Sequence, residues 1–357
     1  MGGVDGPSGI VQAHRGDAIR LGEGSPLGRE AREALEEAVL VPGATRALGA
    51  GRRRAEEAPD PERTCFERDR DRIVHSKAFR RLAGKTQVFV FPDDHQRTRL
   101  THALEVAQVA TAIARACGLN VALTEAIALG HDCGHGPGGH ASEAVFDAVL
   151  PGGFHHATFG AGVVLDSLNL CAETLDGIAS HSWSLPAPKT PEGAVVSWAD
   201  RIAYCAHDLE DAIHAGIVSV RELPAAIVEA AGPTRSSQLR YFISAMVDTL
   251  SSARVVAMAS EPASVLAALR NFNYEHIYLR DEAIGQGKAV QAVLHALLEH
   301  FVAHPEVLPQ LAEGADPLAS AIAYVAQMTD RYAFDAAVRL LDWPRSALPR
   351  GIDVARL

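Results

Sequence analysis

The sequence predicts an all-α fold: a bundle of helices followed by a C-terminal helical extension, with at most short β-hairpins. Of its 357 residues, 48% are hydrophobic but only 6% are aromatic, and alanine is abundant. This mixture favours closely packed helices, because sheets are enriched in β-branched and aromatic residues. From residue 63 onward, apolar residues recur almost continuously at helical spacing, without the strand–helix alternation of a parallel sheet.

Three regions are expected along the chain. Residues 1–60 are rich in Gly, Arg and Ala, and they are predicted to form a mobile segment with one amphipathic helix near 29–40. Residues 61–220 are predicted to form the helical core, and residues 221–357 a C-terminal helical region packed on it. A short strand is predicted at 87–91, where the run QVFVF precedes a turn at 92–94.

Charge and cysteine usage narrow the class of protein. The formal net charge of −11 argues against a general nucleic-acid-binding protein, although residues 63–99 carry a local excess of Lys and Arg. The five cysteines are widely spaced without a C-x-x-C pair, which indicates reduced thiols. Because no apolar run reaches membrane-spanning length and no signal-peptide pattern is present, we expect a cytoplasmic protein without a membrane partner.

Three predicted core helices carry an uncommon set of polar residues. The first, near 100–114, carries His102, and the second, near 123–130, ends at His131 and Asp132 before a glycine-rich loop. The third, near 195–215, has an apolar stripe and a separate polar face. That face comprises Asp200, Tyr204, His207, Asp208 and Asp211, at positions i, i+4, i+7, i+8 and i+11. An ordinary solvated face would carry Lys, Glu and Gln, so this one is typical of a cavity wall.

His102, His131, Asp132 and Asp200 form a candidate metal site. Imidazole offers nitrogen and carboxylate offers anionic oxygen, a combination that suits a divalent metal of intermediate hardness. The adjacent His131 and Asp132 must both point into one cavity from a single helix end, which makes this pair the most informative part of the pattern.

Several long motifs extend this local pattern over most of the chain. They are RTCFERDRDRIVHSKAFRRL at 63–82, GKTQVF at 84–89, RTRLTHALEVAQ at 97–108, HDCGHGPGGH at 131–140, ADRIAYCAHDLEDAI at 199–213, LRNFNYEHIY at 269–278 and MTDRYA at 328–333. Together they resemble the dGTP triphosphohydrolase family of HD-domain enzymes, over roughly residues 63–337. The resemblance implies an HD-domain helical bundle with metal-dependent phosphohydrolase activity.

The resemblance implies a single divalent ion, either Mg, Mn or another transition metal, at the four candidate ligands. Four side-chain ligands leave room for water or a phosphate oxygen, as a metal acting on a phosphoester requires. Next to these ligands, His135 and His140 resemble the family's phosphate-contacting and catalytic histidines. Glu143 lies one helical turn after His140 and is expected to orient its imidazole. His156 matches a histidine near the α-phosphate.

The same resemblance implies a pocket for a deoxynucleotide. Gln87 and Arg99 match positions that contact the deoxyribose and the phosphates, and Arg201 matches a phosphate-facing base. Tyr204 and Asp208 match the pair below the sugar. A close fit of Tyr204 against the C2′ edge would exclude a 2′-hydroxyl.

The chain departs from the family pattern in the loop after the His-Asp pair. Gly136 and Gly138 stand where a Pro and a Phe are usual, and we expect them to loosen the loop at a cost in backbone entropy. After His156, an Asn and a Gln are lost, and Ala323 and Gln327 replace an Asp and a Gly. These changes leave the metal set intact and bear on substrate preference and rate.

The leading hypothesis is the hydrolysis of a deoxynucleoside triphosphate (dNTP), dGTP or another, to deoxynucleoside and inorganic triphosphate. One alternative is a phosphohydrolase for another nucleotide, such as a deoxynucleoside monophosphate or a guanosine alarmone. A further alternative is a nucleotide-sensing protein whose catalysis has decayed. Family resemblance also suggests a homo-oligomer, and an allosteric nucleotide or single-stranded nucleic acid stays open as a partner.

Overall fold

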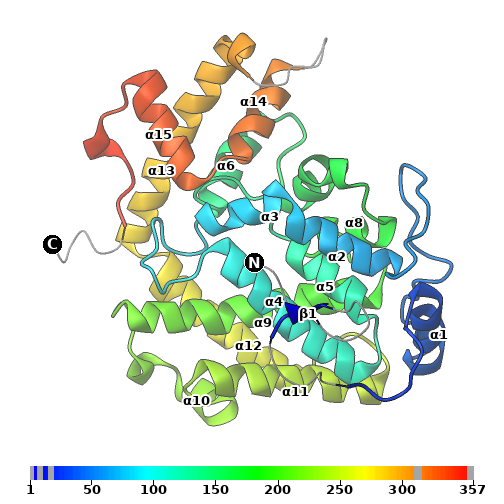
Figure 1. Cartoon of the computed structure of the whole chain (residues 1–357). Helices are drawn as coiled ribbons and strands as arrows, with labels where there is room; N and C mark the ends of the chain where they lie inside the picture. Colours follow the sequence, from blue (N-terminus) through cyan, green and yellow to red (C-terminus); the bar gives the residue numbers. More distant parts are fainter. Residues whose placement is uncertain (1–3, 6–10, 15–19, 309–315, 352–357) are drawn as a thin grey trace.

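The structure, a computed structural model, describes residues 4–5, 11–14, 20–308 and 316–351. It confirms the all-α prediction (Figure 1), with a single antiparallel pair of two-residue strands, β1 (Val4–Asp5) and β2 (Val11–Gln12), among the described residues. The α-helices are α1 Arg29–Val39, α2 Cys65–His75, α3 Lys77–Arg81, α4 Arg99–Cys117, α5 Val121–Gly130, α6 His140–Val149, α7 His156–Phe159, α8 Ala172–Ala179, α9 Pro191–His214, α10 Ala225–Ala231, α11 Arg235–Ala253, α12 Ser260–Asn273, α13 Asp281–Ala303, α14 Pro317–Ala326 and α15 Asp330–Leu341. Within the described ranges, no helix is both long and apolar enough to span a bilayer.

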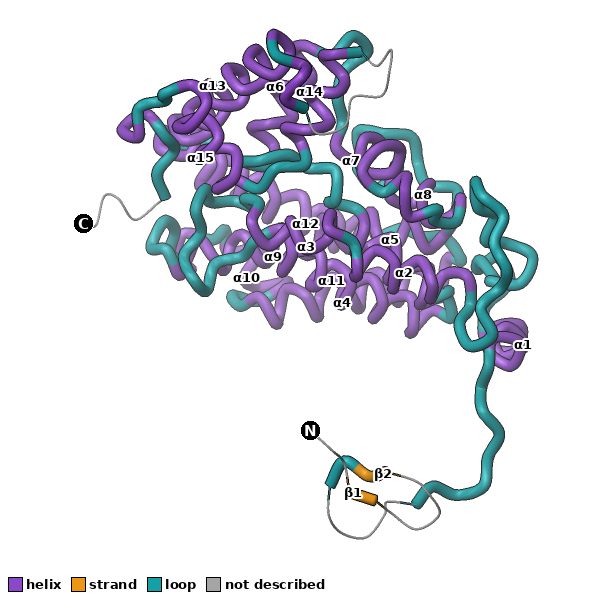
Figure 2. Tube along the Cα trace, turned by 45° about the horizontal axis from the view of Figure 1, so that its top comes forward, coloured by secondary structure: helices purple, strands orange, loops and turns teal. Residues whose placement is uncertain are grey.

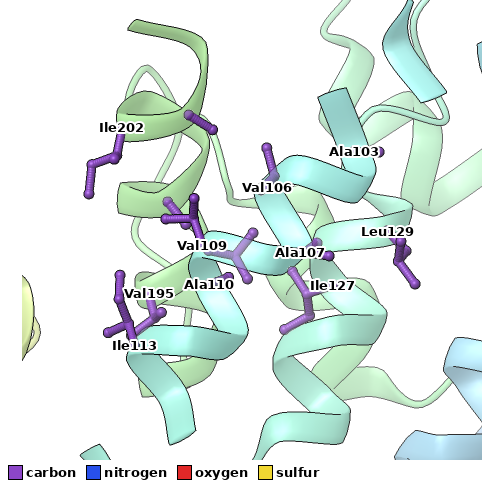
Figure 3. Close-up of a cluster of buried hydrophobic side chains, with 14 of the residues drawn as sticks. Ala103, Val106, Ala107, Val109, Ala110, Ile113, Ile127, Leu129, Val195 and Ile202 are labelled. Atoms are coloured by element: carbon purple, nitrogen blue, oxygen red, sulfur yellow. The ribbon is translucent and has the colours of Figure 1, made fainter. Parts of the chain in front are cut away.

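Helices α4, α5 and α9 form the centre of a large hydrophobic cluster (Figure 3). Thr98 and Thr101 make a capping box at the start of α4, and the helix ends at Gly118, whose φ of 68° is left-handed. Alanines such as Ala103 and Ala110 are fully buried where α4 meets its neighbours, which lets the helices approach closely. The three helices that carry the candidate metal ligands are therefore rigidly packed against one another.

A second, smaller cluster joins α6 to α13, α14 and α15, and Figure 2 shows these helices stacked together apart from the larger bundle. Helices α10, α11 and α12 instead pack into the large cluster. Within the C-terminal half, the packing therefore changes near residue 281, where α13 begins, and the predicted boundary at 220 stays a prediction. It falls there because the apolar faces of α11 and α12 pack on the core helices.

The predicted strand at 87–91 is wrong. Its backbone bends, and the pairing nearby is an isolated antiparallel bridge between Thr86 and Thr98. Phe89 packs in the large cluster and Val90 in the small one, so the apolar run connects two helical cores rather than two strands. The left-handed φ of 52° at Phe91 then ends any extended run.

The predicted helix near 29–40 is confirmed as α1. Beyond it, Thr45 donates to the buried Glu192 on α9 from its backbone N (3.0 Å) and its hydroxyl (2.7 Å). Arg53 forms a buried ion pair of 2.6 Å with Asp69 on α2. Residues 41–53 thus pack on the core, whereas the mobility predicted for the start of the chain stays a prediction, with residues 1–3, 6–10 and 15–19 outside the described part.

Candidate active site

A cavity of about 1060 Å³ lies between the two clusters and gathers nearly all the predicted site residues. Eleven of them line it: Gln87, Arg99, His102, Asp132, His135, His140, His156, Asp200, Arg201, Tyr204 and Asp208. The two others, His131 and Glu143, stand directly behind this lining and contact it. Residues far apart in the sequence are thus assembled into one site.

The four candidate metal ligands converge from α4, the end of α5 and α9. His102 Nε2 lies 3.0 Å from Asp200 Oδ1 and 3.9 Å from Asp132 Oδ2. His131 Nε2 lies 3.4 Å from Asp132 Oδ1 and 3.7 Å from Asp200 Oδ1. His102, His131 and Asp200 offer ligand atoms that lie within 4.8 Å of one another, as the ligands of one divalent ion must, and Asp132 lies beside this group.

The protonation pattern also fits a cation. His131 Nδ1 lies 2.6 Å from the Ala128 carbonyl and must donate to it, which leaves a lone pair on Nε2. That buried Nε2 has no hydrogen-bond partner among the described residues. Burial opposes ionisation of Asp132, but the nearby His131 and Arg99 outweigh it and hold its pKa well below the usual range. His102 and His131 likewise overcome burial and lower the pKa of Asp200, so both carboxylates supply anionic oxygen.

The backbone of the His-Asp loop is held from the small cluster. Asp330, at the start of α15, accepts from the Gly138 N–H (2.8 Å), the Thr86 N–H (2.9 Å) and the Thr86 hydroxyl (2.6 Å). Lys85 Nζ donates to the carbonyls of His135 and of Ala326, the latter at 3.1 Å. Burial lowers the pKa of Lys85 to about 8. These buried bonds fix the loop that carries His135.

The two unusual glycines allow this loop to pack closely. A Cβ at Gly138 would lie 2.4 Å from a methyl group of Val290 on α13, and Gly138 has a φ of +71°. A Cβ at Gly136 would lie 2.6 Å from the Ser142 hydroxyl and 2.8 Å from the Phe146 ring. We expected the glycines to loosen the loop; in the folded protein they instead permit direct contact with α6 and α13.

Glu143 connects two histidines of the site. His140 Nδ1 lies 3.2 Å from Glu143 Oε2, as the spacing predicted. Glu143 Oε1 also accepts from the His156 backbone N–H (2.9 Å) and lies 3.0 Å from His156 Nδ1. Burial acts against ionisation of Glu143, but His140 and His156 reverse the effect and lower its pKa well below the usual range. His140 itself is exposed towards the cavity, so its imidazole is accessible to a substrate.

The opposite wall joins α9 to the end of α12. Tyr278 donates its hydroxyl to Asp208 Oδ2 at 2.5 Å, and Arg270 Nε donates to the Tyr204 hydroxyl at 3.2 Å. Burial raises the pKa of Asp208 to about 7, although the bond from Tyr278 opposes the shift. Tyr204 and Asp208 are therefore fixed side by side by residues of the C-terminal half.

Several cavity residues were not identified from the sequence. His181 follows α8 and is buried against His131, with ring centroids 4.9 Å apart. The Arg201 guanidinium stacks on the Trp183 ring at 3.4 Å, which aims this cation along the cavity wall. Arg270 and Tyr278 belong to the 269–278 motif, in which the family resemblance gave no residue a function. His181 offered no signal beyond belonging to a histidine-rich stretch.

Two protein-family matches indicate the class of protein to which this site belongs. Residues 99–205 match the HD domain, and residues 256–339 match the phosphohydrolase-associated domain. Both matches fit a helical fold with His and Asp side chains gathered at one cavity. The fold and the site are those of an HD-domain phosphohydrolase.

The chain belongs to the deoxyguanosinetriphosphate triphosphohydrolase-like family. The protein of that name from Caldanaerobacter subterraneus subsp. tengcongensis is 41% identical over 316 residues, covering 85% of this chain and 93% of the relative. Its namesake from Clostridium perfringens (strain 13 / Type A) is 42% identical over 301 residues, covering 79% and 88%. A crystal structure of a hypothetical protein from Aquifex aeolicus shares 17% identity at a TM-score of 0.48, covering 78% of this chain and 69% of that one.

Proposed function

We propose that the protein hydrolyses a dNTP to deoxynucleoside and inorganic triphosphate in a metal-dependent reaction. The observation that carries the proposal is that His102, His131 and Asp200 offer ligand atoms within 4.8 Å of one another, beside Asp132, at one cavity. Its volume of about 1060 Å³ exceeds what a small phosphate ester needs. The names of the relatives support the same substrate class.

Cations and an aromatic wall support a triphosphate and a deoxyribose. Arg99 and Arg201 line the metal side of the cavity, and Arg280 and Lys288 line the part formed by α13. Guanidinium and ammonium groups are the usual partners of phosphate oxygens. We assign Gln87 to the deoxyribose and the phosphates, and Tyr204 with Asp208 to the lower side of the sugar.

Each residue then has a chemical task. A divalent ion at the four ligands would supply Lewis-acid polarisation of a phosphoryl oxygen. Water attacks the α-phosphorus while the bond to O5′ breaks, and the proton lost by water must reach O5′. His140 is placed to move that proton, with Glu143 holding its Nδ1 side. His135 and His156 would contact the phosphate that is attacked.

Product chromatography tests this function. The protein is incubated with each dNTP, singly and mixed, in Mn²⁺ or Mg²⁺, and we expect deoxynucleoside and inorganic triphosphate. Release of diphosphate or monophosphate would favour a phosphohydrolase of another class. Metal-loaded protein that binds dNTPs yet releases no product would favour a nucleotide sensor.

We also propose a cytoplasmic homo-oligomer. The cytoplasmic location is inferred from the unpaired, widely spaced cysteines, and the homo-oligomer from the sequence resemblance. Light scattering at micromolar concentration tests the oligomeric state. Activation by a second nucleotide or by single-stranded nucleic acid is tested by adding each to the same product assay.

A further inference from the structure

We propose that Trp183 is a positioning residue, which holds the Arg201 guanidinium in place for the phosphates that follow the one at the metal ligands. Trp183 lies in the turn between α8 and α9, and Arg201 is on α9. The pair would make the cavity prefer a nucleoside triphosphate to a monophosphate. This inference rests on the proposed function, in which the attacked α-phosphate lies at the metal ligands.

The contact between the two side chains leaves the cation free to bind an anion. Arg201 Cζ lies 3.4 Å from the centroid of the Trp183 ring, where the negative face of the indole attracts it. Arg201 forms no ion pair with any of the described residues, and its buried Nε has no hydrogen-bond partner among them. Its charge and its N–H donors are therefore available to a phosphate.

Arg99, the other cation on the metal side of the cavity, is held in a different way. Its Nη1 donates to Asp132 Oδ2 at 2.7 Å, and both side chains are buried. The carboxylate takes up one N–H of Arg99 and offsets part of its charge. A stacked aromatic ring fixes a guanidinium without neutralising it. Arg201 is therefore the cation better suited to the additional charge of a triphosphate.

The Trp183 ring is fixed by residues of α9. Its Nε1–H donates to the Ser197 carbonyl at 3.1 Å, and its ring meets that of Trp198 edge-on, with centroids 4.6 Å apart. The Ser197 hydroxyl donates to the His181 carbonyl at 2.6 Å, which joins the turn to the helix. Because Ser197 and Arg201 are four residues apart on α9, they share one face of the helix. A ring anchored at Ser197 is thus placed over Arg201.

The pair lies on the side of the metal ligands away from the assigned sugar. Along α9, Tyr204 comes about one turn after the metal ligand Asp200, whereas Ser197, which anchors Trp183, comes almost one turn before it. Helical side chains lean towards the N-terminus of their helix, which directs Arg201 back over Trp183. Trp183 is 46% exposed, so this part of the cavity reaches solvent. Phosphates beyond the α-phosphate would extend past Arg201, and a monophosphate has none to place there.

Calorimetric titration with inorganic triphosphate and with inorganic phosphate, both in Mg²⁺, tests the proposal without turnover. Trp183→Leu should weaken triphosphate binding by about 3- to 10-fold, as expected for the loss of one cation–π contact, and should leave phosphate binding unchanged. Trp183→Phe keeps an aromatic face and should recover most of the affinity. In the product assay, KM for the dNTP should rise by the same factor in Trp183→Leu, with little change in kcat.

Arg201→Gln tests whether Trp183 acts through Arg201. In the Arg201→Gln background, Trp183→Leu should have no further effect on triphosphate binding, because the contact is already lost. Trp343→Phe is the matched control for Trp183→Phe, since Trp343 packs on the small cluster and does not line the cavity. Circular dichroism establishes that each variant is folded, and Trp183→Met replaces Trp183→Leu if the latter is not.

Three results would overturn the proposal. They are unchanged triphosphate affinity in Trp183→Leu, additive losses in the double variant, and weaker binding of the deoxynucleoside alone, which would make Trp183 a direct contact of the base. Triphosphate binding with the expected coupling, but without hydrolysis of any dNTP, would leave this inference standing while the proposed function fails.

Discussion

The two hydrophobic clusters contribute to the cavity in different ways. The large cluster supplies side chains directly: His102 and Asp200 project from long helices packed on their apolar faces. The small cluster supplies His140 and Glu143 from α6, together with buried polar groups that hold the backbone of the His-Asp loop. Under the proposed function, long and rigidly packed helices would hold the metal ligands, whereas contacts between the two clusters would position the proton-transfer pair and the His-Asp loop.

The largest effect is expected from the large cluster. Asp200→Ala removes an anionic ligand, so bound metal and turnover should both be lost, with kcat falling by about 10³-fold or more. Elemental analysis and the product assay measure the two losses, and circular dichroism should show an intact fold because Asp200 lines the cavity. Full activity of this variant in chelator would contradict the assignment.

On α6, His140 and Glu143 should act as a unit. His140→Ala, Glu143→Ala and the double variant should each lose about 10²- to 10⁴-fold in kcat, without additivity. Because Glu143 also holds His156, its single variant should be at least as impaired as that of His140. The divalent ion at the candidate metal site should be retained, because neither His140 nor Glu143 is one of its proposed ligands. Single variants that turn over at the unmutated rate would exclude the proposed proton transfer.

The loop restraint gives a third test of the comparison. Asp330→Ala removes the acceptor for the Gly138 and Thr86 hydrogen bonds, so the His-Asp loop should shift. This shift should lower kcat by about 10²-fold, while KM and the content of divalent metal change little. Asp335→Ala, an exposed position on the same helix, is the control. Loss of metal together with kcat would mean that the small cluster also maintains the metal site.

The sugar wall should show a smaller effect. Tyr204→Ala opens space beside the proposed deoxyribose, so the preference for dGTP over GTP in kcat/KM should fall by about 10-fold or more. Tyr204→Phe keeps the ring and loses only the bond from Arg270, so it should retain the preference. If the unmutated protein already hydrolyses GTP and dGTP equally, Tyr204 does not select the sugar.

The smallest effect concerns stability and pH. Burial raises the pKa of Asp208 from 3.8 to about 7, so the folded state favours its neutral form. The neutral Asp208 carboxyl therefore contributes fully to the free energy of unfolding below about pH 3.8, and this contribution is lost as the pH rises through 7. As the pH rises from 5 to 8, the free energy of unfolding of Asp208→Asn should therefore increase by about 1–3 kcal/mol relative to that of the unmutated chain. Urea unfolding of the metal-free proteins measures the difference, and an equal pH dependence would show that Asp208 is ionised when folded.

The sequence by itself determined the helical class and the composition of the candidate site. Apolar spacing located the helices around residues 100–114, 123–130 and 195–215, because a helix repeats its buried face within a few residues. The same spacing placed Glu143 one turn from His140. The run QVFVF, in contrast, has the alternation of a strand, and only its position between two helical cores explains why it bends.

Tertiary structure alone decided the contacts between distant segments. Asp330 reaches Gly138 across 192 residues, Tyr278 reaches Asp208 across 70, and His181 meets His156 across 25. Residues so far apart share no helical periodicity, so their pairing depends on how the helices pack. Local spacing and the family resemblance could therefore point to the candidate side chains, but the packing of the two clusters determines which groups hold them and why two histidines face each other beside Asp132.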